Sequence, residues 1–183
     1  MTEKSAFTSE PQMPEARVSL ITEISKADMI DLCDATVTAI ENGGGFGWVV
    51  VPERDVLERF WRGVLAMPQR HLFVARLDDV ICGTAQLVLP PHNNEAQSHA
   101  VHLTSTFLTP WARGYGLAKK LVEAAERKAK QDHFKVINLD VRETQQEAIN
   151  LFETQGYKQC GIHPFYAYVD EKPVKGYYYY KLL

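Results

Sequence analysis

A short turn, Arg113-Gly114-Tyr115-Gly116, carries the residue types best suited to hold an anionic ligand. An apolar, β-branched run at 101–108 precedes it, and apolar residues at helical spacing follow from Leu117. The first amides of a helix lack an intrahelical partner and lie at the positive end of the helix dipole, so they attract anions. The glycines let the backbone approach such a ligand closely, and Arg113 and Lys119 add positive charge. The pattern therefore predicts an anion site between a strand and a helix.

Two common phosphate-binding loops do not fit this turn. The nucleoside-triphosphate loop ends in Gly-Lys-Ser or Gly-Lys-Thr, a sequence that the turn does not contain. The dinucleotide fingerprint G-x-G-x-x-G needs a third glycine where this chain has Lys119. The turn is therefore neither of these two loops.

The elements that must position this turn follow from periodicity, caps and turn residues. Ser25 is predicted to cap the first helix, and Thr144 is predicted to form a capping box with Glu147 on the last. Asp78-Asp79 predicts a tight hairpin, and Gly156 predicts the end of the last helix. The predicted element order is β-α-α-β-β-β-α-β-α-β-β. Its strands cover 18–24, 71–77, 80–89, 101–108, 135–141, 157–162 and 176–183, and its helices begin near 25, 53, 117 and 144.

The composition is that of one globular domain. The chain has 183 residues, of which 45% are hydrophobic and 23% charged, enough for a full-sized core. Residues 16–183 are predicted to form a single domain, and the polar, proline-bearing stretch 1–15 a flexible N-terminal tail. No apolar run approaches membrane-spanning length, and 1–10 lacks the apolar core of a signal peptide.

Charge and cysteine usage narrow the expected partners and compartment. The formal net charge is -3 and no basic run stands out, which argues against broad nucleic-acid binding. The three cysteines, Cys33, Cys82 and Cys160, are widely spaced and fit neither a disulfide framework nor a zinc site. We therefore expect a cytoplasmic protein with no metal, no nucleic-acid partner and no membrane association.

The turn also resembles a known family motif. Arg113-Gly114-Tyr115-Gly116-Leu117-Ala118 is similar to the R/Q-x-x-G-x-G/A signature of the GNAT superfamily of acyl-CoA N-acyltransferases. A second segment, Ala148-Ile149-x-Leu151-Phe152-x-x-x-Gly156-Tyr157, resembles the family's A-I-x-L-Y-x-x-x-G-F. The resemblance covers 18–183 and implies the GNAT fold, an α/β arrangement whose mixed, mostly antiparallel sheet of about seven strands is flanked by about four helices. Within the superfamily, 42–48 and 176–182 look like the branch of the tabtoxin-resistance acetyltransferase.

The resemblance implies acetyl-CoA as acyl donor. In the family the loop amides hold the cofactor's pyrophosphate, and the end of the preceding strand offers N–H and C=O groups to the pantetheine arm. Preorganised donors of this kind stabilise the oxyanion that develops on a thioester carbonyl. The residues expected to bind the cofactor are Phe107, Leu108, Thr109, Arg113, Gly114, Tyr115, Gly116, Leu117, Ala118, Lys119, Gln145 and Phe152.

The resemblance further implies direct transfer of the acyl group to an amine, which requires a proton acceptor. A carboxylate or an imidazole can serve, directly or through water. His102 lies on the strand leading into the cofactor loop, and Asp140 lies near the end of the neighbouring predicted strand, so both could face one cleft. A lone strand histidine is more often structural, and an aspartate at a strand end is often a turn residue. The sequence leaves Asp140 and His102 level, with Glu41 and Glu95 as weaker candidates.

The chain departs from the family at Phe152. Many members place a tyrosine there to protonate the leaving thiolate, and phenylalanine has no proton to give. A thiol of pKa about 8.5 is a fair leaving group, so solvent could suffice. Tyr157, Tyr166 or Tyr168 could substitute if the fold brings one of them within reach.

The sequence says least about the substrate. The glycine-rich stretch 42–48 reads first as a helix stop, and second as a loop whose Phe46 and Trp48 line a substrate pocket. The predicted function is an acetyl-CoA-dependent N-acetyltransferase acting on a small-molecule amine, with a homodimer as a possible assembly. Two alternatives stay open: an acyltransferase that uses another acyl-CoA, and a non-catalytic acyl-CoA-binding or regulatory module.

Overall fold

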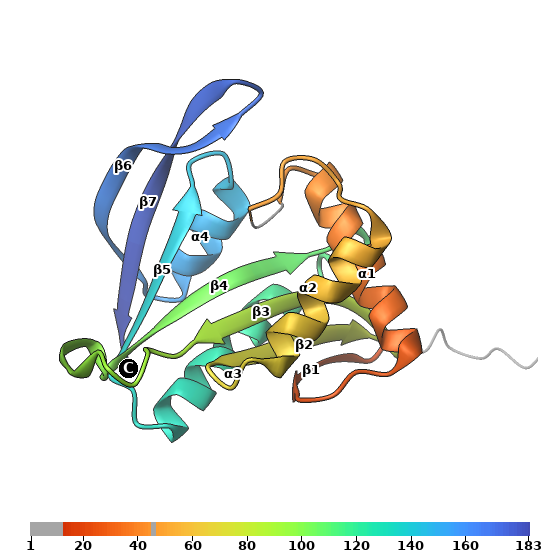
Figure 1. Cartoon of the computed structure of the whole chain (residues 1–183), viewed down its shortest axis with the longest axis horizontal. Helices are drawn as coiled ribbons and strands as arrows, with labels where there is room; N and C mark the ends of the chain where they lie inside the picture. The colour runs from red at the N-terminus through yellow and green to blue at the C-terminus, as the bar shows by residue number, and fades with distance from the viewer. Residues whose placement is uncertain (1–12, 45–46) are drawn as a thin grey trace, which may run out of the picture.

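The computed structural model describes residues 13–44 and 47–183, which form one seven-stranded sheet in the order β1-β2-β3-β4-β5-β7-β6 (Figure 1). Neighbouring strands are antiparallel except β4 and β5, which run parallel. Two short 3₁₀ turns, η1 and η2, flank β4. The elements are β1 Ala16–Ile21, α1 Lys26–Glu41, α2 Arg54–Ala66, β2 Arg70–Leu77, β3 Val80–Val88, η1 Glu95–Gln97, β4 Ala100–Leu108, η2 Pro110–Ala112, α3 Leu117–Gln131, β5 Val136–Arg142, α4 Gln146–Thr154, β6 Lys158–Val169 and β7 Lys172–Leu182.

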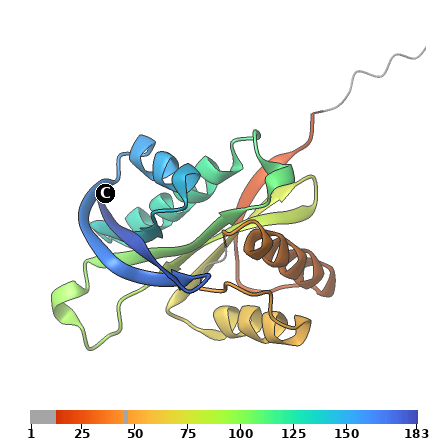
Figure 2. The same cartoon turned by 90° about the horizontal axis from the view of Figure 1, so that it is seen from above.

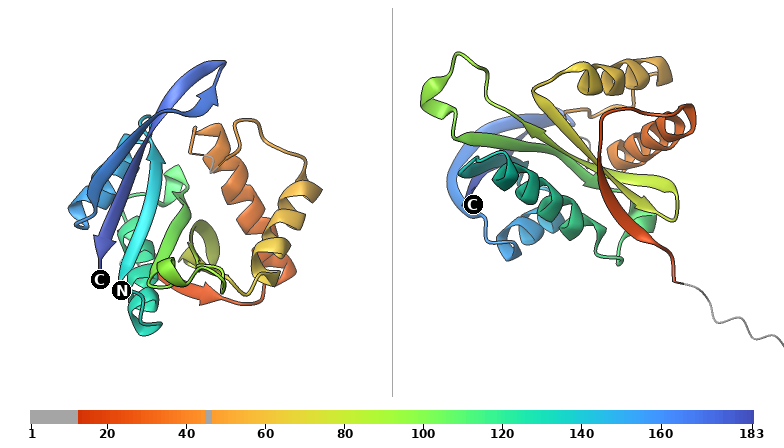
Figure 3. Two further views of the ribbon diagram at one scale, coloured as in Figure 1. Left: turned by 60° about the vertical axis from the view of Figure 1, so that its left-hand side comes forward. Right: turned by 90° about the horizontal axis from the view of Figure 1, so that it is seen from below.

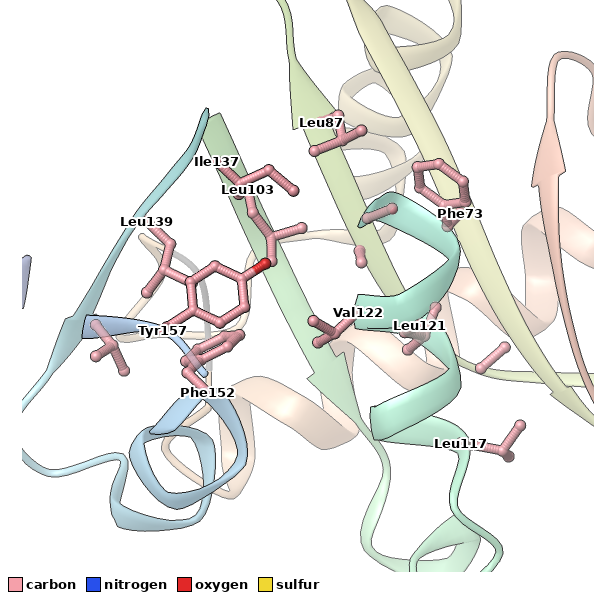
Figure 4. Packing of buried hydrophobic residues seen from close by; sticks show 14 of the residues in the cluster. Phe73, Leu87, Leu103, Leu117, Leu121, Val122, Ile137, Leu139, Phe152 and Tyr157 are labelled. Atoms are coloured by element: carbon pink, nitrogen blue, oxygen red, sulfur yellow. The ribbon is translucent and has the colours of Figure 1, made fainter. Parts of the chain in front are cut away.

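The sheet separates two helical layers. Figure 2 shows α3 and α4 on one face of the sheet and α1 and α2 on the other. Figure 4 shows Leu121 and Val122 of α3 directed toward the strands, where Leu103 and Ile137 meet them in one buried cluster. On the opposite face, Trp61 of α2 is fully buried in a second cluster. Removal of this apolar surface from water is the main force that holds the layers together.

The two parallel strands separate after a short ladder. Ala100–Leu103 pairs with Val136–Leu139, and beyond this point β4 and β5 diverge (Figure 3, left). The cause lies in β4, whose register against β3 shifts between the pairs Thr84–Phe107 and Gln86–Thr104. At this bulge Ser105 adopts a left-handed φ of 49°, and its carbonyl accepts a hydrogen bond of 2.7 Å from the buried Thr84 hydroxyl. An extra residue in one strand bends it, so the bulge turns β4 away from β5.

Gly83 fits β3 closely against the end of β4. A Cβ built on Gly83 would lie 2.5 Å from the Phe107 carbonyl oxygen and 2.8 Å from the Leu108 Cδ1 atom. Real Cβ atoms essentially never approach another atom this closely. Glycine is therefore required here by space, because the two backbones touch where β4 ends.

Several predicted boundaries and caps are confirmed. The Ser25 hydroxyl accepts the amide of Asp28 at 3.0 Å and so caps α1. The Asp78-Asp79 turn joins β2 to β3, with Asp78 at a φ of 48°. Gly156 follows α4 with a φ of 87°, the left-handed conformation expected at a helix end.

Three local predictions are wrong. The N-cap of α4 is Gln145 and not Thr144, and no side chain closes the predicted capping box. The first strand ends at Ile21, before the predicted residue 24. The predicted strands 157–162 and 176–183 leave a loop at 163–175, yet β6 and β7 continue through this stretch to a two-residue turn at Asp170-Glu171. Both turn residues have positive φ, 49° and 61°, which suits the twist of a tight hairpin.

No helix within 13–44 and 47–183 is both long enough and apolar enough to cross a bilayer.

Candidate active site

Two adjoining cavities lie where β4 and β5 separate. The first, of about 420 Å³, lies between the end of β4, the start of α3 and the helix α4. The second, of about 540 Å³, is bounded by β4, β5, β6 and the segment after α1. Gly44, Thr106, Gln145 and Ala148 line both cavities, so the two spaces meet along these residues. A ligand in one cavity can therefore reach a ligand in the other.

The predicted anion turn lies at the mouth of the first cavity. Gly114 and Gly116 have left-handed φ values of 87° and 72°, and Gly116 is the N-cap of α3. The first bond within the helix runs from the Lys120 amide to the Gly116 carbonyl at 3.1 Å. The three amides before it belong to Leu117, Ala118 and Lys119, and they lie at the positive end of the α3 dipole. The geometry is that of a helix N-terminus suited to a phosphate group.

Arg113 joins the anion turn to α4. Its guanidinium pairs with the carboxylate of Glu147 at 3.1 Å, and both side chains are largely exposed. Exposed pairs of this kind contribute little to stability, so an anionic ligand can compete for the guanidinium. Glu147, predicted to close a capping box, instead pairs with Arg113 beside the first cavity.

The remaining predicted cofactor residues fall into two groups. Phe107, Leu108, Arg113, Ala118 and Gln145 line the first cavity, and Phe152 lines the second. Leu117 and Thr109 are fully buried, Tyr115 is 39% exposed, and Lys119 pairs with Glu123 at 3.7 Å.

Gln145 spans the cleft at the point where the cavities meet. Its side-chain amide donates to the Gly43 carbonyl at 2.5 Å, which links the start of α4 to the end of α1. The side-chain amide that was predicted to touch the cofactor holds the two sides of the cleft together in this structure.

Asp140 and His102 lie together beside the second cavity, as expected from their positions on neighbouring predicted strands. The His102 Nε2 atom lies 2.8 Å from the Asp140 Oδ1 atom. Asp140 lines the cavity, and the His102 imidazole beside it keeps 41% of its surface exposed. The hydrogen bond from His102 is the main reason that the pKa of Asp140 lies below its ordinary value, although burial opposes the shift. Asp140 is therefore an ionised carboxylate at neutral pH.

Tyr166 of β6 is the second hydrogen-bond donor to this carboxylate. Its hydroxyl donates to the Asp140 Oδ2 atom, so both carboxylate oxygens have a partner. Burial, together with the neighbouring Asp140, raises the pKa of Tyr166 above its ordinary value, and the phenol stays protonated. Among the tyrosines considered as proton donors, Tyr166 and Tyr168 line the second cavity.

Phe152 and Tyr157 belong mainly to the core. Phe152 is 4% exposed and packs edge-on against Tyr157, with ring centroids 5.6 Å apart (Figure 4). Burial raises the pKa of Tyr157 strongly, so it stays a neutral phenol. Phe152 has no proton to give, and the Tyr157 phenol is not among the residues that line either cavity, so neither side chain is placed to protonate the leaving thiolate.

The remaining predicted residues are Glu41, Glu95, Phe46 and Trp48. Glu41 and Glu95 are not among the residues that line either cavity in the described part of the chain. Trp48 packs edge-on against Phe60 of α2 at 4.8 Å, and Phe46 lies outside the described residues. A substrate contact by Phe46 or Trp48 therefore stays a prediction.

Sequence reasoning missed Thr104 and Arg142, which line the second cavity. Strand periodicity could have found them, because residues two apart on a strand share a face. Thr104 lies two residues after His102 on β4, and Arg142 lies two residues after Asp140 on β5.

Among the described residues, no group of three or more His, Cys, Asp or Glu side chains could hold a metal ion.

Comparisons with known proteins agree on the family. The acetyltransferase (GNAT) family profile matches residues 38–157. A protein of Azospirillum brasilense, named as an uncharacterized N-acetyltransferase in the hisH-hisA intergenic region, is 54% identical over 133 residues, 73% of this chain and 79% of its own length.

Solved structures share the fold at low sequence identity. An N-acetyltransferase of Staphylococcus aureus Mu50 has a TM-score of 0.76 and 16% identity, covering 92% of this chain and 98% of its own. The structure of yncA of Salmonella typhimurium, solved with its cofactor acetyl-CoA, has a TM-score of 0.75 and 14% identity, covering 92% and 94% of the two chains.

Proposed function

The chain belongs to the GNAT family of acetyltransferases and is an N-acetyltransferase, and from this premise we propose that it moves the acetyl group of acetyl-CoA to the amine of a small molecule. The observation that carries the proposal is the junction of the two cavities. One cavity ends at a glycine-bearing helix N-terminus, and the other contains an ionised carboxylate. An anionic donor and a cationic acceptor would therefore meet near Thr106 and Gln145.

Acetyl-CoA suits the first cavity by its chemistry. Its pyrophosphate needs amide donors and positive charge, which the start of α3 and Arg113 supply. Its pantetheine arm needs an apolar wall with backbone hydrogen-bonding groups, and Phe107 and Leu108 line the cavity where β4 has left β5. The structural relative yncA was solved with acetyl-CoA.

The Asp140–His102 pair suits the acceptor amine. An ammonium group entering the second cavity meets the Asp140 carboxylate, which attracts it but is a weak base because its pKa is lowered. His102, bonded to that carboxylate, takes the ammonium proton, directly or through water. The pair thus divides the work: Asp140 orients the imidazole and binds the cation, and His102 holds the proton.

The transfer then follows from the free amine. Its nitrogen attacks the thioester carbonyl and forms the new C–N bond, the nitrogen then releases its second proton to solvent, and the C–S bond breaks as coenzyme A leaves as a thiolate. Solvent protonates that thiolate, which is a tolerable leaving group near neutral pH. This route accommodates Phe152 without a tyrosine at that position.

A thiol-release assay with acetyl-CoA and a panel of small amines tests the proposal. We expect at least one amine to release free coenzyme A well above the hydrolysis background, and Gly116→Glu to abolish that release while the protein stays folded. Acetyl-CoA should also raise the melting temperature of the wild type, since it binds the folded state. A melting shift without thiol release from any amine would favour the non-catalytic acyl-CoA-binding module instead.

A further inference from the structure

β6 departs from regular pairing beside the second cavity. His163 pairs with Gly176 and Ala167 pairs with Val174, so three residues of β6 face one residue of β7. Within this bulge the His163 Nδ1 atom accepts the Phe165 amide at 3.1 Å. A bulge redirects the side chains that it contains. The bulge therefore determines where Tyr166 points.

Gly176 makes room for the Tyr166 ring. A Cβ built on Gly176 would lie 2.2 Å from the Cγ atom of Tyr166 and 2.4 Å from its Cδ2 atom. The ring thus lies directly against the Gly176 backbone, where any other residue would place a side chain. Tyr178, the next-but-one residue on β7, supports the same ring edge-on, with centroids 6.3 Å apart.

The position of the ring places its hydroxyl on Asp140. Tyr166 donates to Oδ2 while His102 lies 2.8 Å from Oδ1. Two donors from different strands fix the plane of the carboxylate, and its remaining lone pairs stay available to a ligand. The titratable groups around Asp140 are His102 of β4, Tyr166 of β6 and Tyr178 of β7, and Arg142 lies two residues along β5.

We infer that Tyr166 is a positioning residue for the Asp140 carboxylate, and that Gly176 is the residue that lets it act. The inference rests on the proposed function, because it gives Asp140 its part in catalysis. Tyr166 does not touch the reacting atoms; it fixes the carboxylate that orients His102 and receives the substrate ammonium.

The first test is Tyr166→Phe. Loss of a hydrogen bond to a charged group should lower kcat/KM for the amine by about tenfold or more. The lost bond also favoured the ionised form of Asp140, which the proposed reaction requires, so protonation of Asp140 should reduce kcat/KM from a higher pH and move the acidic limb in that direction. The matched control is Tyr180→Phe, on β7 and outside both cavities, which should leave the limb in place.

Gly176→Ala provides a second, independent perturbation. The added methyl group should push the Tyr166 ring off Asp140 and reproduce the kinetic effect of Tyr166→Phe. In a Tyr166→Ala background the ring is gone, so Gly176→Ala should then add little. Additive losses in kcat/KM would mean that Gly176 acts by another route and would overturn its assigned role.

A readout without turnover separates this inference from the proposed function. Carbon-13 NMR titration of the Asp140 carboxyl should give a higher pKa in Tyr166→Phe than in the wild type, whether or not an amine substrate is known. An unchanged carboxyl titration and an unchanged acidic limb would refute the role of Tyr166. Absence of thiol release by the wild type, with the carboxyl titration shifted as expected, would refute the proposed function alone.

Discussion

Replacement of Gly83 by alanine tests the geometry of the first cavity with a single methyl group. The built Cβ lies 2.5 Å from the Phe107 carbonyl oxygen, whereas ordinary contact begins at 3.4 Å, so that oxygen would have to retreat by about 0.9 Å. The Leu108 side chain, 2.8 Å away, can rotate. The Phe107 backbone cannot move so freely, because β4 is paired with β3 at this point.

The expected cost is large for so small a change. Overpacking of a well-packed core costs about 1–3 kcal/mol, and an obstacle made of strand backbone favours the upper part of that range. Under the proposed function the same backbone positions the thioester, and a shift approaching 1 Å can cost about 100-fold in rate. We therefore expect Gly83→Ala to lower both the unfolding free energy in urea and kcat/KM for acetyl-CoA.

Gly63→Ala is the matched control. Gly63 lies within α2, and a Cβ built there meets nothing within 4 Å. The same chemical change should therefore stabilise the protein, by about 0.5–1 kcal/mol, since alanine favours helix over glycine. An unfolding free energy of Gly83→Ala equal to the wild type would refute the close approach of β3 and β4. Lower stability with an unchanged kcat/KM would confirm the close packing but would refute the role of this backbone in positioning the thioester.

Three further predictions concern single side chains and their hydrogen bonds. Thr36→Val removes the hydroxyl that accepts a hydrogen bond of 3.1 Å from the Trp61 indole N–H, in a fully buried site. The variant should lose about 1–3 kcal/mol of unfolding free energy in urea, and Thr36→Ser, which keeps the hydroxyl, should restore most of it. Ser25→Ala should lose about 1 kcal/mol through its missing cap, whereas Thr144→Ala should change thermal stability little, since Thr144 caps nothing. Asp140→Asn should lower the free energy of unfolding at pH 7. Because the pKa of Asp140 is lowered in the folded state, the difference in unfolding free energy between wild type and variant should shrink as the pH falls below about 4. A difference that persists at that pH in urea unfolding would contradict this cause.

The fold could be predicted where local patterns decide it. The apolar repeat of α3 is buried as its spacing requires, and Leu121 and Ala125 are fully inaccessible. Local patterns failed where distant contacts override them. Thr144 satisfies a capping rule, yet the N-cap of α4 is Gln145, and its side-chain amide donates to the Gly43 carbonyl. The rule considers only neighbours in the chain, whereas this partner lies 102 positions away.

The candidate site likewise has one contact that the sequence predicts and one that depends on the paired strands. His102 and Asp140 were predicted to face one cleft because they lie on neighbouring predicted strands, and the structure places the His102 Nε2 atom 2.8 Å from the Asp140 Oδ1 atom. The contact of Tyr166 with Asp140 could not be predicted, because it depends on a bulge in β6 and on the space above Gly176. Both appear only when the two strands are paired in their actual register.

The separation of β4 and β5 gives the sheet an edge in its interior. Pairing between these strands ends at Leu103 and Leu139, so beyond that point the backbone groups of β4 that face away from β3 meet no strand among the described residues. Unpaired strand edges are templates for association with other chains, and proteins usually cover them. Under the proposed function the pantetheine arm of acetyl-CoA is that cover. The ligand-free protein is then the form whose β4 amides beyond Leu103 exchange fastest with solvent, so bound acetyl-CoA should slow the hydrogen exchange of these amides.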